Sequence, residues 1–310
     1  MLSIRNIVKQ YANHTALDGV SMEIEKGSIF GLLGPNGAGK TSLIRIINQI
    51  TAPDSGEVFF NGEKLNPNHI SKIGYLPEER GLYKKMEIGE QVLYLAQLKG
   101  LSRPMAIQCV KYWFEKLEIQ SWWHKKVEEL SKGMQQKVQF VATVLHDPEL
   151  LILDEPFSGF DPINAETIKN EILELNQKGT TIIFSTHRME SVEELCDSIA
   201  LLNKSQKILD GKVKDIKHSY RTDTYKINFS GPAPSLNSEA GTLFDVIENT
   251  SDGEYGKLTV KMLKDYSSND LLKILIPKIS IHGFEEVIPS INDIFITKVK
   301  ESGNFLPHEH

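Results

Sequence analysis

A glycine-rich stretch, GPNGAGKT at residues 34–41, is the feature that most restricts how this chain can fold. It follows an apolar run and precedes residues spaced as one face of a helix, so it predicts a strand, a tight loop and a helix in succession. Main-chain amides in such a loop can surround a polyphosphate, and the helix N-terminus adds partial positive charge. Lys40 can reach the outer phosphates, and the Thr41 hydroxyl is a hard oxygen ligand suited to Mg²⁺.

A second motif, LLILDEP at residues 150–156, places two acids directly after four apolar residues. In a parallel sheet, ligands bind at the carboxyl ends of the strands. Asp154 is therefore expected to hold Mg²⁺ through water, and Glu155 to orient or activate an attacking water. The stretch FSTH ends a further strand, so His187 is expected on the same sheet edge, where a neutral imidazole can donate a hydrogen bond to a phosphate.

Two short stretches have the composition of helix caps. In SGFD, Asp161 precedes a proline at the first helical position, which is a common way for a helix to begin. In LSKGMQQK, at residues 130–137, Ser131 precedes an apolar stripe that starts at Met134, so its hydroxyl can cap that helix. A helix N-terminus with a serine hydroxyl also suits an anion, so this stretch equally fits one half of a binding site.

The apolar pattern divides the chain into two domains. Strands alternating with helices predict an α/β domain over residues 1–218, with a mostly parallel sheet core, an antiparallel β subdomain and a helical subdomain at about 85–146. Shorter alternating strands and helices predict a small accessory α+β domain at residues 222–303. Residues 304–310 are expected to form a tail.

Composition limits the environment in which the protein can act. The 310 residues carry a formal net charge of −6, so nucleic acid is not expected as a partner. The two cysteines, Cys109 and Cys196, lack a CxxC spacing and fit a reducing cytosol. No apolar run approaches the roughly 18–20 residues that span a bilayer, so a role at a membrane requires another protein to hold this one there.

The order of GPNGAGKT, LSKGMQQK, LLILDEP, SGFD and STH resembles that of the ATP-binding cassette (ABC) ATPases over roughly residues 1–218. In detail the chain is similar to the ATPase subunits of bacterial ABC-2-type sodium or antibiotic exporters, which often carry a C-terminal extension. The resemblance implies a P-loop NTPase fold of the ABC type, with ATP and Mg²⁺ as cofactors. It also implies that Tyr11 stacks on adenine. The remaining implied ATP contacts are Gly34, Pro35, Asn36, Gly37, Ala38, Gly39, Lys40, Thr41 and Ser42.

The same resemblance implies a role for the LSKGMQQK stretch in nucleotide binding. It implies that Ser131, Gly133 and Asp161 contact the nucleotide bound by a second ATPase subunit. Two chains arranged head to tail about a twofold axis then enclose two nucleotides. Whether the pair consists of identical or related chains stays open.

Hydrolysis follows from the resemblance as well. Glu155 is expected to be the general base, with His187 holding the γ-phosphate end. The implied Mg²⁺ ligands are Thr41, Asp154 and Glu78.

The chain departs from the family pattern in two places. The signature usually reads LSGGQ, but here Lys132 and Met134 replace a glycine and the glutamine. After IGYLP the family has a glutamine, whereas this chain has Glu78, which accepts hydrogen bonds but cannot donate them when ionised. Both variants resemble those of the efflux subfamily.

The resemblance predicts the ATPase subunit of an exporter, bound to a separate transmembrane permease at the cytoplasmic side of the cell membrane. The loop PEERGLYKKMEIGEQ at residues 77–91 is the expected contact for a permease helix. One alternative is a soluble ABC ATPase that acts on a translation or repair assembly, although such proteins usually carry two cassettes or a coiled-coil insertion. Another is a regulatory module whose C-terminal domain binds a ligand.

Overall fold

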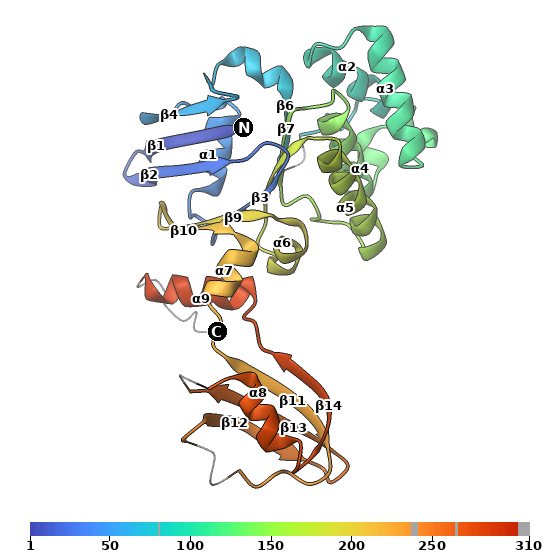
Figure 1. The fold of residues 1–310 in the computed structure, drawn as a ribbon. Coiled ribbons are helices and arrows are strands. Elements are labelled where there is room, and N and C mark those ends of the chain that lie inside the picture. The colour runs from blue at the N-terminus through green and yellow to red at the C-terminus, as the bar shows by residue number, and fades with distance from the viewer. Residues whose placement is uncertain (80, 237–240, 264–265, 303–310) are drawn as a thin grey trace. The chain divides into compact units, whose positions relative to one another are not determined.

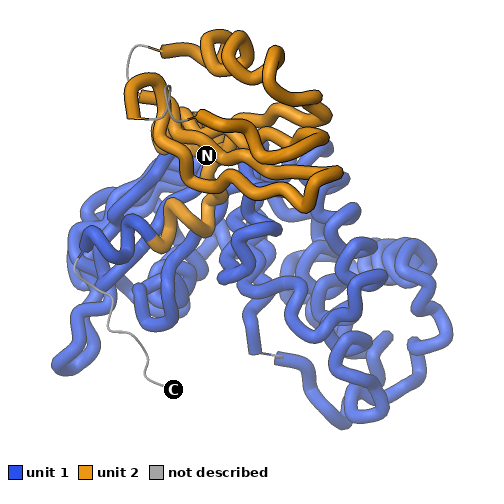
Figure 2. The backbone as a smooth tube through the Cα atoms, turned by 90° about the horizontal axis from the view of Figure 1, so that it is seen from below, with its two compact units in different colours: residues 1–213, 297–310 blue, residues 214–296 orange. Residues whose placement is uncertain are grey.

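The computed structural model describes residues 1–79, 81–236, 241–263 and 266–302, and within them the chain forms two compact units (Figure 2). Unit 1 comprises Met1–Val213 together with the residues from Thr297 onward, and unit 2 comprises Lys214–Ile296. The predicted tail at residues 304–310 lies outside the described residues.

Unit 1 contains an antiparallel sheet near the N-terminus, with strand order β2-β1-β4-β5 (Figure 1). Its strands are β1 (Leu2–Tyr11), β2 (His14–Ile24), β4 (Ser55–Phe60) and β5 (Glu63–Lys64). The Asn61-Gly62 pair joins β4 to β5 with φ angles of 51° and 85°, the geometry that favours these two residue types in a hairpin. The predicted antiparallel β subdomain is confirmed.

The second sheet of unit 1 has six strands in the order β10-β9-β3-β8-β7-β6. They are β3 (Ile29–Leu33), β6 (Ile73–Leu76), β7 (Leu150–Asp154), β8 (Thr181–Ser185), β9 (Ser198–Asn203) and β10 (Gln206–Lys212). All neighbours are parallel except β10, which pairs antiparallel with β9. Every residue of β3, β7 and β8 is buried, because helices or strands cover both faces of a parallel sheet.

Helix α1 (Lys40–Ile47) lies between the two sheets. Its buried leucine and isoleucines belong to one core cluster with side chains of the antiparallel sheet and with Phe30, Leu32 and Ile152 of the parallel sheet. Helices α5 (Pro162–Gln177) and α6 (Met189–Leu195) lie on the other side of the parallel sheet (Figure 1). This packing fixes the loop that leads into α1.

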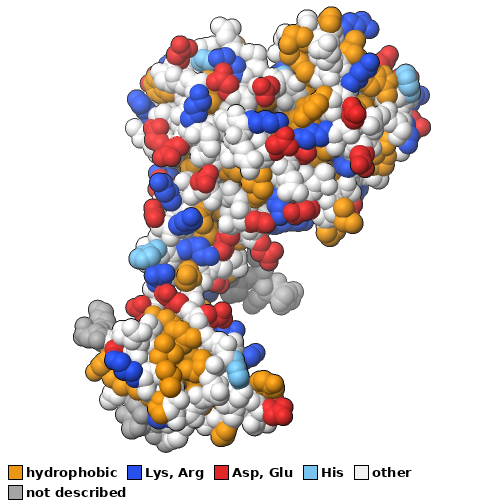
Figure 3. Space-filling model, turned by 45° about the vertical axis from the view of Figure 1, so that its right-hand side comes forward, with side chains coloured by type: hydrophobic (Ala, Val, Ile, Leu, Met, Phe, Trp, Pro, Cys, Tyr) orange, Lys and Arg blue, Asp and Glu red, His pale blue; other side chains and the backbone are white. Residues whose placement is uncertain are grey.

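A helical layer occupies the middle of the sequence. It contains α2 (Ile88–Leu98), α3 (Arg103–Lys116), α4 (Lys132–Val144) and the short 3₁₀ helices η2 (Gln120–Trp122) and η3 (Val127–Glu129); a third, η1 (Pro67–Lys72), precedes β6. Several of its hydrophobic side chains are exposed, among them Tyr94, Leu98 and Tyr112, and Figure 3 shows hydrophobic side chains at this surface among charges of both signs.

Unit 2 is a four-stranded antiparallel sheet in the order β12-β13-β11-β14, with α8 (Ser268–Leu275) on one face. Its strands are β11 (Thr224–Ser230), β12 (Phe244–Ser251), β13 (Tyr255–Met262) and β14 (Ser280–Glu286). Alternate strand residues pack on Leu271 and Leu275 of the helix. The division between the units falls within α7 (Val213–Ser219) and α9 (Ile291–Glu301).

Candidate functional site

Four strands of the parallel sheet deliver the predicted site residues to one edge. The glycine loop follows β3, Glu78 follows β6, Glu155 follows β7, and His187 follows β8. These strands are parallel, and Asp154 at the end of β7 pairs in register with Ser185 at the end of β8. Their carboxyl ends therefore meet at the place where doubly wound sheets bind ligands.

Glycine occurs at three positions of the loop for different physical reasons. A Cβ atom at Gly34 would lie 2.3 Å from the Leu202 carbonyl oxygen, and one at Gly39 would lie 2.3 Å from the Ala16 carbonyl oxygen. Both residues also have φ angles, 149° and 109°, that L side chains rarely adopt. A Cβ atom at Gly37, in contrast, would meet no atom within 4 Å beyond its own chain neighbours, so this side of the loop is open for a phosphate to approach.

Lys40 holds the loop in shape from within. Its ammonium group donates hydrogen bonds to the carbonyl oxygens of Gly34 at 2.7 Å and Pro35 at 3.2 Å. Burial lowers the pKa of Lys40, while the charges of Asp154 and Glu155 act in the opposite direction. The Lys40 ammonium group therefore already lies inside the loop, where it can pair with a bound anion.

Three carboxylates, those of Glu78, Asp154 and Glu155, lie near Lys40 and affect one another. Burial raises the pKa of Asp154, and the charges of Glu78 and Glu155 raise it further. These three acids and Lys40 therefore place a net negative charge beside the glycine loop when all of them are ionised. Within the described ranges no set of three His, Cys, Asp or Glu side chains is arranged to hold a metal ion by itself.

Glu155 and His187 are in direct contact. The Glu155 carboxylate accepts hydrogen bonds from the His187 main-chain N–H at 2.8 Å and from the Thr186 hydroxyl at 3.1 Å, and lies 2.6 Å from His187 Nδ1. Glu155 has a φ of 50°, an unusual value for a non-glycine residue. Sequence reasoning placed Glu155 and His187 on one edge but missed the Thr186 hydroxyl, which the FSTH stretch already contained.

The remaining predicted residues form a second group, around the N-terminus of α4. Ser131 caps this helix by accepting a hydrogen bond from the Met134 N–H at 3.3 Å, as predicted. A Cβ atom at Gly133 would lie 3.1 Å from the Gly159 carbonyl oxygen, so the signature stretch packs on the turn that leads to Asp161. Asp161 caps α5, also as predicted.

In the part of the chain that the structure describes, this second group is not hydrogen-bonded to the glycine loop. Ser131 and Asp161 are exposed. No hydrogen bond among the described residues joins Ser131, Gly133 or Asp161 to residues 34–42. Their side of the molecule therefore presents an open helix N-terminus to solvent.

Tyr11 lies at the end of β1, and the residue is 40% exposed. The Lys9 ammonium lies 5.4 Å from the ring centroid. The exposed ring provides a flat surface on which a base can stack.

Sequence reasoning missed a connection between α4 and the segment that carries Glu78. The Gln139 side-chain amide donates hydrogen bonds to the carbonyl oxygens of Pro77 and Glu79, both at 3.4 Å, which flank Glu78. The Thr143 hydroxyl, one turn further on, donates a hydrogen bond to the Gln139 carbonyl oxygen at 2.8 Å and lies 3.5 Å from the Tyr75 carbonyl oxygen. The buried polar residues Gln136, Gln139 and Thr143 recur at helical spacing along α4, and this polar stripe was the available signal.

Together these features define a nucleotide-binding α/β protein with a phosphate loop. Comparison with known proteins agrees: residues 17–158 match the family model "ABC transporter", and residues 211–299 match "ATP-binding protein DrrA1-3-like, C-terminal domain". The chain is 42% identical to the uncharacterized ABC transporter ATP-binding protein YhaQ of Bacillus subtilis (strain 168), covering 96% of this chain and 98% of the relative. The chain therefore belongs to the ABC transporter ATP-binding proteins, which confirms the resemblance seen in its motifs.

Two further similarities bear on the ATPase part. The linearmycin resistance ATP-binding protein LnrL of the same Bacillus strain is 34% identical, covering 72% of this chain and 73% of LnrL. A solved structure described as the ATP binding subunit of an ABC transporter matches with a TM-score of 0.66 at 29% identity, covering 71% of this chain and 93% of that one. The predicted P-loop fold of the ABC type is confirmed. Among the residues described, no helix combines the length and apolar character needed to cross a bilayer.

Proposed function

We propose that this chain binds and hydrolyses ATP as the motor subunit of an ABC exporter and drives a separate permease at the cytoplasmic face of a membrane. The observation that carries the proposal is the division of its site into two groups on one chain. One group is the glycine loop with the carboxylates at the sheet edge, and the other is the exposed N-terminus of α4. The linearmycin resistance named for LnrL supports an efflux direction.

Each group supplies half of the machinery. The loop at residues 34–42 holds the phosphates, Lys40 neutralises their charge, and Tyr11 stacks on adenine. Ser131, Gly133 and Asp161 of a second subunit close over the same nucleotide. The ATPase domain is proposed to span residues 1–218, with an accessory domain at 222–303, a division that the C-terminal family match at 211–299 supports.

Hydrolysis depends on Glu155. Its carboxylate removes a proton from the attacking water. In the structure, His187 contacts the Glu155 carboxylate; once a nucleotide is bound, His187 positions its γ-phosphate. Thr41, Asp154 and Glu78 are the proposed Mg²⁺ ligands, and the ion would offset charge on the phosphates. Loss of the γ-phosphate removes the charge that the exposed N-terminus of α4 attracts, so the two subunits separate.

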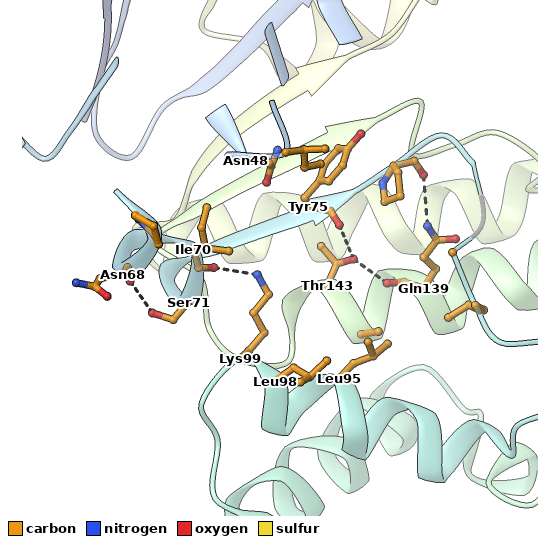
Figure 4. Close-up of a pocket in the computed structure, with 16 residues that line it drawn as sticks. Asn48, Asn68, Ile70, Ser71, Tyr75, Leu95, Leu98, Lys99, Gln139 and Thr143 are labelled. Carbon is orange, nitrogen blue, oxygen red and sulfur yellow. Dashed lines mark hydrogen bonds between the residues drawn. The ribbon is translucent and has the colours of Figure 1, made fainter. Parts of the chain in front are cut away.

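The permease is proposed to bind a groove between the helical layer and the sheet core of unit 1 (Figure 4). The groove has a volume of about 920 Å³, and Pro77, Gly81 and Leu82 of the predicted contact loop form part of its wall. Gln139 and Thr143 also border it. Because Gln139 binds the backbone on both sides of Glu78, a helix in the groove can alter the position of that carboxylate.

An ATP-trapped dimer tests the proposal. With ATP and Mg²⁺, the Glu155→Gln chain is expected to have the mass of a dimer by size-exclusion chromatography with light scattering. Adding Ser131→Glu is expected to give a monomer, because the new carboxylate repels the phosphates bound by the partner. Ser102→Glu is the matched control, since Ser102 is another exposed serine that precedes a helix but makes no capping hydrogen bond. Equal dimer yield from Ser131→Glu and Ser102→Glu would contradict the shared site.

A further inference from the structure

Lys99 follows α2 and lies in the wall of the groove (Figure 4). Its ammonium group donates hydrogen bonds to the carbonyl oxygens of Ile70 at 2.9 Å and Ile73 at 2.7 Å. Both acceptors are neutral, and an ammonium group has three donors, so one donor and the full positive charge remain for another partner.

Among the described residues, the absence of an ion pair distinguishes Lys99 from Lys116 and Lys169. Lys116, whose side chain is 20% exposed, contacts Glu171 and Glu174, and Lys169, 16% exposed, contacts two glutamates. No described carboxylate is paired with Lys99. Burial lowers the pKa of Lys99, and no neighbouring acid counteracts that effect. Buried charges in proteins are usually paired.

The surroundings of Lys99 suit an amphipathic helix. Leu95, Leu98, Ile50 and Ile70 line the same groove, and Leu98 and Ile50 are 65% and 60% exposed. Exposed apolar side chains along a groove are the usual anchors for a helix bound in it. On such a helix, residues three or four positions apart face the same side.

We propose that the permease segment bound in this groove is a helix that presents an aspartate or glutamate to Lys99, three or four residues from an apolar side chain that packs on Leu98. This inference rests on the proposed docking of a permease and adds the chemistry of the docking segment. The carboxylate supplies the anion that Lys99 lacks and accepts its remaining N–H.

Photo-crosslinking identifies the segment. The photoreactive residue p-benzoylphenylalanine is introduced at Leu98 in cells that carry the whole transporter, and crosslinked peptides are sequenced by mass spectrometry. The expected peptide belongs to a membrane protein and contains Asp or Glu within four residues of the crosslinked position. A membrane peptide with no acidic residue in that span overturns the inference and leaves the proposed function intact, whereas crosslinks confined to soluble proteins overturn both.

Charge variants then test the pairing itself. Lys99→Met is expected to weaken retention of the permease on the tagged subunit about 10- to 100-fold, the loss typical of a hydrogen bond to a charged group. Lys99→Arg keeps the charge and is expected to retain the permease. Thermal melting of the purified variants shows whether the loss of the two carbonyl contacts has unfolded the chain.

A charge exchange gives the decisive comparison. Lys99→Glu alone is expected to release the permease, and exchanging the identified carboxylate for lysine in the permease is expected to restore binding. Failure of this exchange, with both proteins folded, overturns the pairing of Lys99 with that acid.

Discussion

The Glu155 carboxylate and His187 are joined twice, through the main-chain N–H at 2.8 Å and through Nδ1 at 2.6 Å. The Glu155 side chain is 14% exposed, whereas that of His187 is 73% exposed. Glu155, the proposed base, is therefore held by a residue whose own side chain can reorient into solvent or toward a ligand. Binding of a nucleotide can change this contact without unfolding either strand end.

Replacing Glu155 tests its role as the base. Glu155→Gln keeps the size of the side chain but cannot accept the proton of water, so ATP turnover is expected to fall by about 10²–10⁴-fold with ATP binding retained. Glu190→Gln, at an exposed position in α6, is the control and should leave turnover unchanged. Phosphate release at saturating ATP measures both. Turnover within a few-fold of the parent protein argues against the assignment.

Lys40 is expected to control nucleotide affinity. Lys40→Ala removes the cation and its contacts with Gly34 and Pro35, which lie in the loop itself. Loss of charge-assisted hydrogen bonds to phosphate predicts affinity about 10- to 100-fold weaker. Titration of a fluorescent ATP analogue measures the change. An unchanged dissociation constant, with circular dichroism showing an intact fold, is incompatible with this role.

His146 gives unit 1 a specific dependence on pH. Burial, with the nearby Lys99 charge, lowers the pKa of His146 from 6.5 to about 4. The folded chain keeps this imidazole neutral while the unfolded chain protonates it below pH 6.5, so stability falls as the pH drops from 6.5 towards 4. A shift of this size corresponds to about 3 kcal/mol at most.

Urea unfolding across that pH range checks the expectation. His146→Gln should lose less stability between pH 6.5 and pH 4.5 than the parent protein, while His14→Gln, at an exposed position, should follow the parent. Identical pH dependence in His146→Gln and the parent rules out this histidine as the source.

The parts of the fold that were predictable are those determined by neighbouring residues. The stretch from Ile29 to Ile47 gives a strand, a glycine loop and a helix because its apolar spacing and its glycines act locally. The caps at Ser131 and Asp161 are equally local, since each bonds a main-chain N–H three residues on.

Contacts between distant segments could not be predicted in this way. The Leu202 carbonyl, in another strand, fills the space beside Gly34. The sequence suggests that this glycine makes room for a phosphate, but the structure shows that it also makes room for that carbonyl. The bonds from Gln139 to the segment around Glu78 likewise depend on how α4 docks on β6. No alternation or motif records such docking, because it follows from the whole fold.

Lys116 joins the helical layer to the sheet core, and its loss is expected to be costly. Its ammonium group in α3 lies 2.5 Å from Glu171 and 2.7 Å from Glu174, both in α5, and Glu171 is only 11% exposed. Lys116→Met leaves Glu171 buried without its cation, so the free energy of unfolding should fall by about 3 kcal/mol or more. Glu174→Gln, at a 42% exposed carboxylate, should cost less than about 1 kcal/mol.

Because paired removal of a buried ion pair is often neutral, Lys116→Met with Glu171→Leu should recover most of the loss in urea unfolding. Equal losses from Lys116→Met and Glu174→Gln would show that Glu171 does not depend on this lysine.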